Sequence, residues 1–159
     1  IVRVFSHMTA AENALIGALL RARSVEDARR RALEALEQVG MRGYGDRQAA
    51  DLVLVDRMRL ELARALCTAP ALLLVDELMA GLNMAEVEAM VGVLRGLRER
   101  GMTIVVIEHN MKALMRLCDR VLALDAGVIV AEGKAEAVSR DPRVIESYLG
   151  EKFAHAIDR

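Results

Sequence analysis

The apolar and polar positions of the first third of the chain follow the period of an α-helix. Thr9 and Glu12 are spaced as a capping box, in which each side chain binds a backbone amide at the start of a helix. After a second capping residue, Ser24, apolar residues recur every three or four positions until Gly40, a residue type that often ends helices. The pattern predicts three helices, at about residues 9–20, 24–40 and 55–68.

From residue 71 onward, short apolar segments alternate with helical ones. Residues 71–76 and 103–108 read as strands, and Asn83 caps the helix between them, which ends at Gly101. A strand, a crossover helix and a second strand form a right-handed unit with parallel strands, so the fold class is α/β. The remaining pattern predicts a short helix at 111–117, a hairpin with its turn at 125–127, and helices at 134–139 and 142–149.

Both predicted parallel strands end abruptly in acidic residues. Residues 72–77 read Leu-Leu-Leu-Val-Asp-Glu, and the second strand is followed by His109. The carboxyl ends of parallel strands form the edge where open α/β sheets bind ligands, so we expect Glu77 and His109 to meet there. This set suits metal-assisted attack of water on a phosphate: Asp76 would hold Mg²⁺, Glu77 would polarise the water, and His109 would contact the terminal phosphate. Alternatively, Asp76 only caps the next turn and His109 has no chemical role.

Composition narrows the classes of function. The chain has 159 residues, 54% of them hydrophobic, which supports a globular domain with a sizeable core. Its 22 basic and 23 acidic residues give a formal charge of −1, which argues against a nucleic-acid partner. No apolar run approaches the roughly 18 residues that span a bilayer, so we expect a cytoplasmic protein. Cys67 and Cys118 lack the spacing of a zinc site and are predicted to be packed thiols.

Four segments, in order along the chain, resemble the ATP-binding subunits of ABC transporters. Residues 72–77 resemble the Walker B segment with its catalytic Glu, and residues 80–83, Ala-Gly-Leu-Asn, fall where the D-loop follows. Residues 107–109 match the switch-histidine loop, and residues 60–66 resemble the helix after the ABC signature. The sequence of residues 80–83 and 107–111 is most similar to that of the ATP-binding subunits of branched-chain amino acid importers. The resemblance covers Thr9 to Gly150.

The resemblance implies a partial P-loop NTPase fold and an ATP- and Mg²⁺-dependent activity for the intact protein. That protein would hydrolyse ATP as a dimer with a second ATP-binding subunit and power import of branched-chain amino acids or related solutes. Its other partners would be membrane permease subunits, which would hold it peripherally on the inner face of the cell membrane. The implied site adds Gly81 and Asn83 of the D-loop and Asp56 of the signature position to Asp76, Glu77 and His109.

The sequence also departs from the family pattern. It contains no Gly-x-x-x-x-Gly-Lys-Ser/Thr, the loop whose amides and Lys hold phosphates, so these residues alone are expected to be inactive. An amino-terminal truncation explains both this absence and the start at Ile1. The alternative is a degenerate, non-catalytic pseudo-ATPase or fragment that serves as a dimerisation or docking module.

The signature position is unusual as well. Residues 52–56 read Leu-Val-Leu-Val-Asp where the family commonly has Leu-Ser-Gly-Gly-Gln. Val side chains obstruct the close approach of a helix start to a phosphate, and Asp56 adds a negative charge. The alternative is that these Val and Leu residues are ordinary core at the entrance of a helix.

The predicted organisation is a single incomplete ABC-type ATPase domain. A helical subdomain occupies about 9–68, the core with Walker B, D-loop and switch histidine about 69–133, and C-terminal helices 134–159. The basic residues at 21–23 and 29–31 are interleaved with acidic residues at helical spacing, which favours a solvated face of ion pairs. A docking face for the membrane subunits is the alternative.

Overall fold

The structure is a computed structural model that describes residues 3–149. The chain divides after Ile107 into two compact units, which are described separately. Among the described residues, the first unit contains helices α1 (Ala10–Ala18), α2 (Val25–Gln38) and α3 (Leu54–Leu66), the 3-10 turn η1 (Ala49–Asp51), strands β1 (Leu72–Asp76) and β2 (Thr103–Ile107), and helix α4 (Met84–Glu99). The second contains α5 (Met111–Leu117), strands β3 (Val121–Asp125) and β4 (Val128–Gly133), α6 (Ala135–Val138), α7 (Pro142–Val144) and the π-helical turn η2 (Ile145–Leu149).

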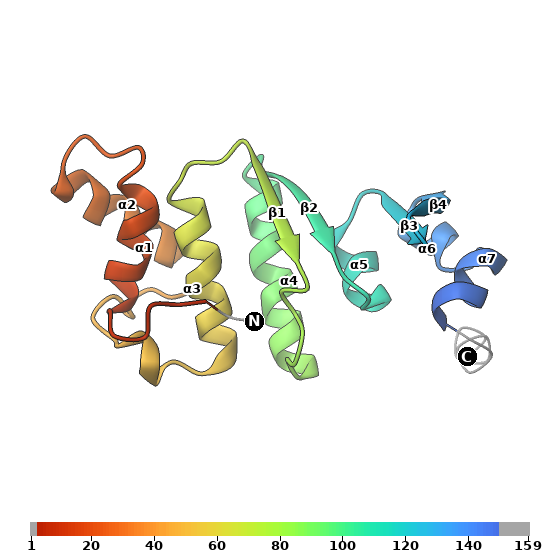
Figure 1. Cartoon of the computed structure of the whole chain (residues 1–159), viewed down its shortest axis with the longest axis horizontal. Coiled ribbons are helices and arrows are strands. Elements are labelled where there is room, and N and C mark those ends of the chain that lie inside the picture. Colours follow the sequence, from red (N-terminus) through yellow and green to blue (C-terminus); the bar gives the residue numbers. More distant parts are fainter. Residues whose placement is uncertain (1–2, 150–159) are drawn as a thin grey trace. The chain divides into compact units, whose positions relative to one another are not determined.

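Helices α1, α2 and α3 pack together as a three-helix group (Figure 1). The predicted capping box of α1 is confirmed, because the Glu12 amide donates to Thr9 Oγ1 at 3.2 Å and the Thr9 amide donates to Glu12 Oε2 at 2.8 Å. The buried residues of this group include many small side chains, which allow close helix packing. The fully buried alanines are Ala10, Ala14, Ala18, Ala28, Ala32 and Ala63.

The second helix, α2, separates an apolar face from a charged one. Its cap is Ser24, whose Oγ accepts from the Asp27 amide at 3.1 Å. Arg30 pairs with Asp27 and Glu34, and Arg31 pairs with Asp27. The predicted ion pairs are therefore confirmed for Arg30 and Arg31.

A parallel two-stranded sheet and one helix form the rest of the first unit. Strands β1 and β2 pair in parallel from Leu72 opposite Thr103 to Asp76 opposite Ile107, as predicted. Asn83 and Glu86 form the capping box that begins α4, with bonds of 3.0 and 2.9 Å. Helix α4 runs behind the two strands in Figure 1 and buries its apolar residues. These are Val87, Met90, Val91, Leu94 and Leu97.

The second unit is built on the predicted hairpin. Strands β3 and β4 are antiparallel, and they are joined by Ala126 and Gly127 at φ 48° and 82°, the positive values of a tight two-residue turn. Helix α5 has the predicted bounds. The predicted helix over 142–149 begins at Pro142 but changes to π-helical geometry at Ile145. The remainder of the predicted C-terminal helices, after residue 149, lies outside the described residues.

No helix within residues 3–149 is long and apolar enough to cross a membrane.

Candidate functional site

The two predicted acidic residues lie where β1 ends. Asp76 is the last residue of the strand, is exposed, and is level with Ile107 of β2. The amide of the next residue, Glu77, donates to the carbonyl oxygen of Ile107 at 2.9 Å, so the parallel ladder continues by one bond past β1. The ends of the two strands are therefore held at the same level, which is the arrangement predicted for a ligand-binding edge.

Glu77 has an unusual backbone conformation. Its φ is 47°, in the left-handed region, which costs a non-glycine residue about 1–2 kcal/mol. The conformation follows directly from the strand and starts a turn, in which the Ala80 amide donates to the Glu77 carbonyl oxygen at 3.2 Å. Residues held in such rare conformations cluster at functional sites. This geometry marks the loop after β1 independently of its sequence.

The loop from Glu77 to α4 contains both residues that were assigned to the D-loop. Gly81 is exposed and adopts φ 79°, a value that favours glycine. The Oδ1 atom of Asn83 accepts the Glu86 amide as the cap of α4. Both residues thus have local structural roles, and their contact with a nucleotide stays a prediction.

His109 belongs to the second unit, two positions after β2 ends, and its side chain is exposed. The next residue, Asn110, caps α5 by accepting the Ala113 amide at 3.2 Å. Because Glu77 and His109 lie in different units, their predicted meeting stays a prediction.

The signature position forms the entrance to α3. Val53 is its N-cap, makes no side-chain capping bond and is 60% exposed, and Leu54 is 43% exposed. Leu52 and Val55 are buried. The interpretation as core therefore holds for Leu52 and Val55, whereas Val53 and Leu54 stand at the surface.

Asp56 is nearly buried in the first turn of α3, with 12% of its side chain exposed. Its Oδ1 atom lies 3.2 Å from Arg59 Nη1 in an ion pair. The guanidinium neutralises much of the negative charge that Asp56 was expected to add at the helix start. Contact between Asp56 and a nucleotide stays a prediction.

A residue without a predicted role, Arg57, holds the entrance of α3 in place. Its Nε donates to the Leu52 carbonyl oxygen at 2.8 Å, and its Nη2 donates to the Ala50 carbonyl oxygen at 2.8 Å. A basic side chain in the first turn of a helix interacts unfavourably with the helix dipole. The position of Arg57 in the sequence could therefore have indicated that its side chain makes a specific contact.

Asp76 at the strand end could hold a metal ion together with waters and a phosphate ligand. Within residues 3–149 no three His, Cys, Asp or Glu side chains are gathered as a metal site. Mg²⁺ is commonly bound by one or two carboxylates together with waters and substrate phosphates, and the exposed Asp76 carboxylate suits that mode.

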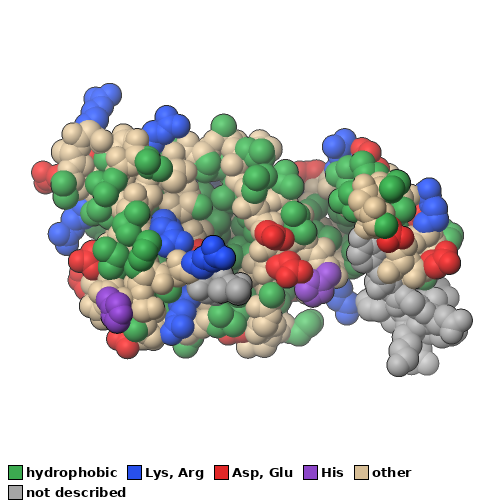
Figure 2. Space-filling view, viewed as in Figure 1, with side chains coloured by type: hydrophobic (Ala, Val, Ile, Leu, Met, Phe, Trp, Pro, Cys, Tyr) green, Lys and Arg blue, Asp and Glu red, His purple; other side chains and the backbone are tan. Residues whose placement is uncertain are grey.

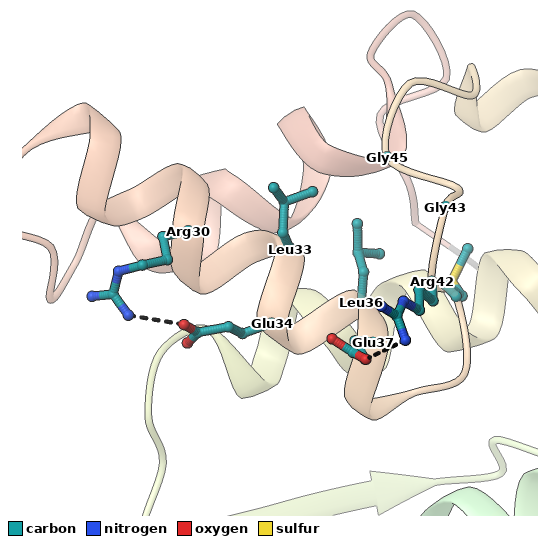
Figure 3. Close-up of a pocket in the computed structure, with 9 residues that line it drawn as sticks. Arg30, Leu33, Glu34, Leu36, Glu37, Arg42, Gly43 and Gly45 are labelled. Atoms are coloured by element: carbon teal, nitrogen blue, oxygen red, sulfur yellow. Dashed lines mark hydrogen bonds and ion pairs between the residues drawn. The ribbon is translucent and has the colours of Figure 1, made fainter.

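A separate cavity of about 300 Å³ lies on the helical group, between α2 and the loop after it (Figure 3). Leu33, Leu36 and Met41 form its apolar part. Two ion pairs border it, Arg30 with Glu34 at 2.9 Å and Arg42 with Glu37 at 3.4 Å. None of the predicted site residues lines this cavity.

The architecture is that of ATP-binding cassettes. The chain is similar to the structure of the ADP conformation of MJ1267, an ATP-binding cassette of an ABC transporter, with a TM-score of 0.80 and 28% identity. That match covers 92% of this chain and 64% of the other. The dimeric structure of MJ0796, a bacterial ABC transporter cassette, matches with a TM-score of 0.72 and 27% identity over 84% of this chain and 60% of the other.

Sequence comparison agrees with the structural comparison. The family model described as "ABC transporter" matches residues 2–80, and that described as "Branched-chain amino acid ATP-binding cassette transporter" matches residues 128–154. The high-affinity branched-chain amino acid transport ATP-binding protein LivG of Escherichia coli is 36% identical over 94% of this chain. BraF of Pseudomonas aeruginosa, with the same description, is 34% identical over the same share. The chain belongs to the ABC transporter family of ATP-binding proteins, and it spans 65% of the length of both relatives.

Proposed function

We propose that the intact protein containing this chain is an ATP-hydrolysing subunit of an ABC importer for branched-chain amino acids or related solutes. The similarity to LivG and BraF, both described as branched-chain amino acid transport ATP-binding proteins, supports the solute class. The structural observation that carries the proposal is the end of β1. There Asp76 and Glu77 are held level with Ile107 of β2, and Glu77 adopts a left-handed backbone conformation.

Each residue of the site has one proposed role. Asp76 holds Mg²⁺ through water, and the bound ion would neutralise charge on the phosphates. Glu77 orients and polarises the attacking water, and His109 contacts the terminal phosphate. Gly81 and Asn83 shape the loop beside the nucleotide, and Asp56 marks the signature position. In this proposal, all six residues belong to one ATP site.

The proposed partners follow from the same assignment. A second ATP-binding subunit completes the dimer, and membrane permease subunits hold the protein on the inner face of the cell membrane. The similarity to a dimeric cassette structure supports the first partner. The 159 residues taken alone form one incomplete domain and should bind ATP weakly and hydrolyse none, because they lack the phosphate-binding Lys and glycine loop.

The test is the Glu77→Gln substitution in the intact protein. Amide nitrogen and oxygen keep the size of the side chain but remove its basicity, so ATP binding should persist while turnover falls by about 100-fold or more. Glu99→Gln is the matched control, since Glu99 is an exposed acid at the far end of α4. If the Glu77→Gln variant still hydrolyses ATP, Glu77 is not the residue that polarises the attacking water.

A non-catalytic docking module is the second candidate, and the exposed Val53 and Leu54 favour it. Apolar side chains at the entrance of α3 suit contact with protein better than contact with phosphate. Measuring ATP hydrolysis in the presence of a second ATP-binding subunit distinguishes the two functions. If the unmodified intact protein binds a second ATP-binding subunit but does not hydrolyse ATP with it, the docking function is favoured.

A further inference from the structure

The loop between α1 and α2, residues 19–24, exposes large apolar side chains at one end of the three-helix group (Figure 1). Leu19 and Leu20 are 53% and 76% exposed, and Val25, the first residue of α2, is 70% exposed. Single apolar residues are common on protein surfaces, but these three belong to one short connection. We call residues 19–25 the α1–α2 tip.

Basic side chains accompany the apolar ones at this tip. Arg21 and Arg23 are exposed, and residues 19–25 contain no acidic residue. Arg29 is exposed one helical turn further along α2. Among the described residues, none of these three arginines forms an ion pair, in contrast to Arg30 of the same helix. Figure 2 shows basic side chains beside hydrophobic ones at the end of the three-helix group where this loop lies. The tip therefore combines apolar surface with positive charge.

The acidic residues that follow the tip do not cancel this charge. Asp27 is engaged in ion pairs with Arg30 and Arg31. Glu26 is exposed in the first turn of α2, and the three exposed arginines outnumber it. A net positive charge remains at this end of the group.

The backbone of the tip is held by hydrogen bonds within the chain. The amides of Arg21 and Ala22 donate to the carbonyl oxygen of Ala18 at 3.0 and 2.9 Å. The Arg23 amide donates to Asp27 Oδ2 at 3.1 Å. Unpaired amides are costly beside hydrocarbon, and these bonds remove that cost for three residues of the loop. The tip can therefore approach an apolar surface without losing backbone hydrogen bonds to water.

Aliphatic and basic side chains on a projecting loop suit an anionic bilayer. Aliphatic side chains enter the boundary between headgroups and acyl chains, while basic residues are attracted to anionic headgroups. The long Arg side chain can keep its guanidinium among the headgroups when its neighbours insert. Protein interfaces are enriched in aromatic residues, and residues 19–25 contain none. The composition of the tip therefore favours lipid over a protein partner.

We propose that the α1–α2 tip binds the surface of an anionic phospholipid bilayer, with Leu19 and Leu20 inserted and Arg21, Arg23 and Arg29 at the headgroups. The binding is weak and reversible, because a few aliphatic side chains anchor a protein only marginally. It would add to the attachment by permease subunits in the proposed function. It rests neither on those subunits nor on ATP hydrolysis.

The experiment measures the partition of the 159-residue chain onto sedimented vesicles. One set of vesicles is phosphatidylcholine alone, and the other is equal parts phosphatidylcholine and anionic phosphatidylglycerol. The unmodified chain should bind the mixed vesicles about tenfold or more better than the neutral ones, and added salt should weaken this binding. Leu20→Glu should lower the partition coefficient on mixed vesicles by about tenfold or more, because a negative charge replaces an inserted apolar side chain.

A second variant tests the charge without changing the leucines. Joint Arg21→Gln and Arg23→Gln substitution should lower binding to mixed vesicles toward the value for neutral ones. The matched control is Met84→Glu, since Met84 is 72% exposed at the start of α4 in the same unit. It should leave the partition coefficient unchanged. Circular dichroism should show that all variants fold, because every substituted side chain is exposed.

Three outcomes overturn the proposal. The first is that the unmodified chain does not prefer the mixed vesicles, and the second is that Leu20→Glu binds them as well as the unmodified chain does. The third is that the chain binds only vesicles that contain permease subunits and that Leu20→Glu weakens this binding, which would assign the tip to a protein partner. The lipid vesicles contain neither permease nor ATP, so failure here is distinct from failure of the Glu77 test.

Discussion

Leu54 of α3 lies against Gly81 of the loop between β1 and α4, with Leu54 Cδ2 3.5 Å from the position of a Cβ atom built on Gly81. This contact joins the predicted signature position to the predicted D-loop within the first unit. The distance is ordinary van der Waals contact, so a methyl group would fit the space. The positive φ of 79° at Gly81 is therefore the stronger constraint.

Gly81→Ala should lower the free energy of unfolding by about 1–2 kcal/mol, the cost of a left-handed conformation for a residue with a Cβ atom. Gly81→Asn should cost less, because Asn tolerates this region through local hydrogen bonds. Urea unfolding of the two variants measures the difference. A larger loss for Asn than for Ala would show that the space beside Leu54, and not the backbone, sets the cost.

Asp56→Ala should destabilise the chain by about 1–3 kcal/mol, because it removes the partner of a mostly buried guanidinium. The Arg59 side chain is 20% exposed, and its Nε atom is buried without a hydrogen-bond partner. Thermal or urea unfolding measures the loss.

The control for this substitution is Glu34→Ala on α2. Glu34 and Arg30 are 54% and 61% exposed, and exposed pairs at this helical spacing contribute about 0.3–0.5 kcal/mol. If the two substitutions cost the same, the Asp56–Arg59 pair is not a buried interaction in solution.

Replacing glycine with alanine should have opposite effects on stability at two positions inside helices. A Cβ atom on Gly17 would lie 2.1 Å from the Arg64 carbonyl oxygen, so α1 and α3 would have to separate. Gly17→Ala should therefore destabilise by about 1–3 kcal/mol or more. Gly92 of α4 is exposed with open space around it, and Gly92→Ala should stabilise by about 1 kcal/mol. Urea unfolding checks both signs, and a neutral Gly17→Ala would contradict the close packing.

Local sequence patterns predicted most of the secondary structure. The capping boxes at Thr9 and Asn83 placed the starts of α1 and α4, because each depends on residues only three positions apart. The hairpin was predicted by its turn residues for the same reason. The predicted helix ends differ from the observed ones by one or two residues, since terminal turns fray and depend on their surroundings.

Features set by distant residues were not predicted. Val25 continues the apolar pattern of α2 but is 70% exposed at the first position of that helix. The ion pair that compensates Asp56 and the positive φ of Glu77 depend on three-dimensional arrangement. At the site, the carboxylates at the strand end were predicted from the pattern of one strand. Their alignment with Ile107 required the sheet register.

Cys67 gives a prediction for the dependence of stability on pH. It is 4% exposed, and burial raises the pKa of its thiol to about 11, opposed by the nearby charge of Arg31. An unfolded cysteine has a pKa of about 8.5, so between these two values the native chain keeps a proton that the unfolded chain has lost. The native state then binds more protons than the unfolded state, and this contribution to stability, complete below the lower value, is lost as the pH rises through the range.

Cys67→Ala removes this titration and is the matched variant. The difference in unfolding free energy between the unmodified chain and Cys67→Ala should be constant from pH 7 to 8 and should shift against the unmodified chain from pH 9 to 11. Other groups titrate in both proteins and cancel in the difference. Because the nucleophile is the thiolate, Cys67 should also resist alkylation at pH 8 until the chain unfolds. A pH-independent difference, together with rapid alkylation of Cys67 in the folded chain, would show that this thiol is accessible to solvent.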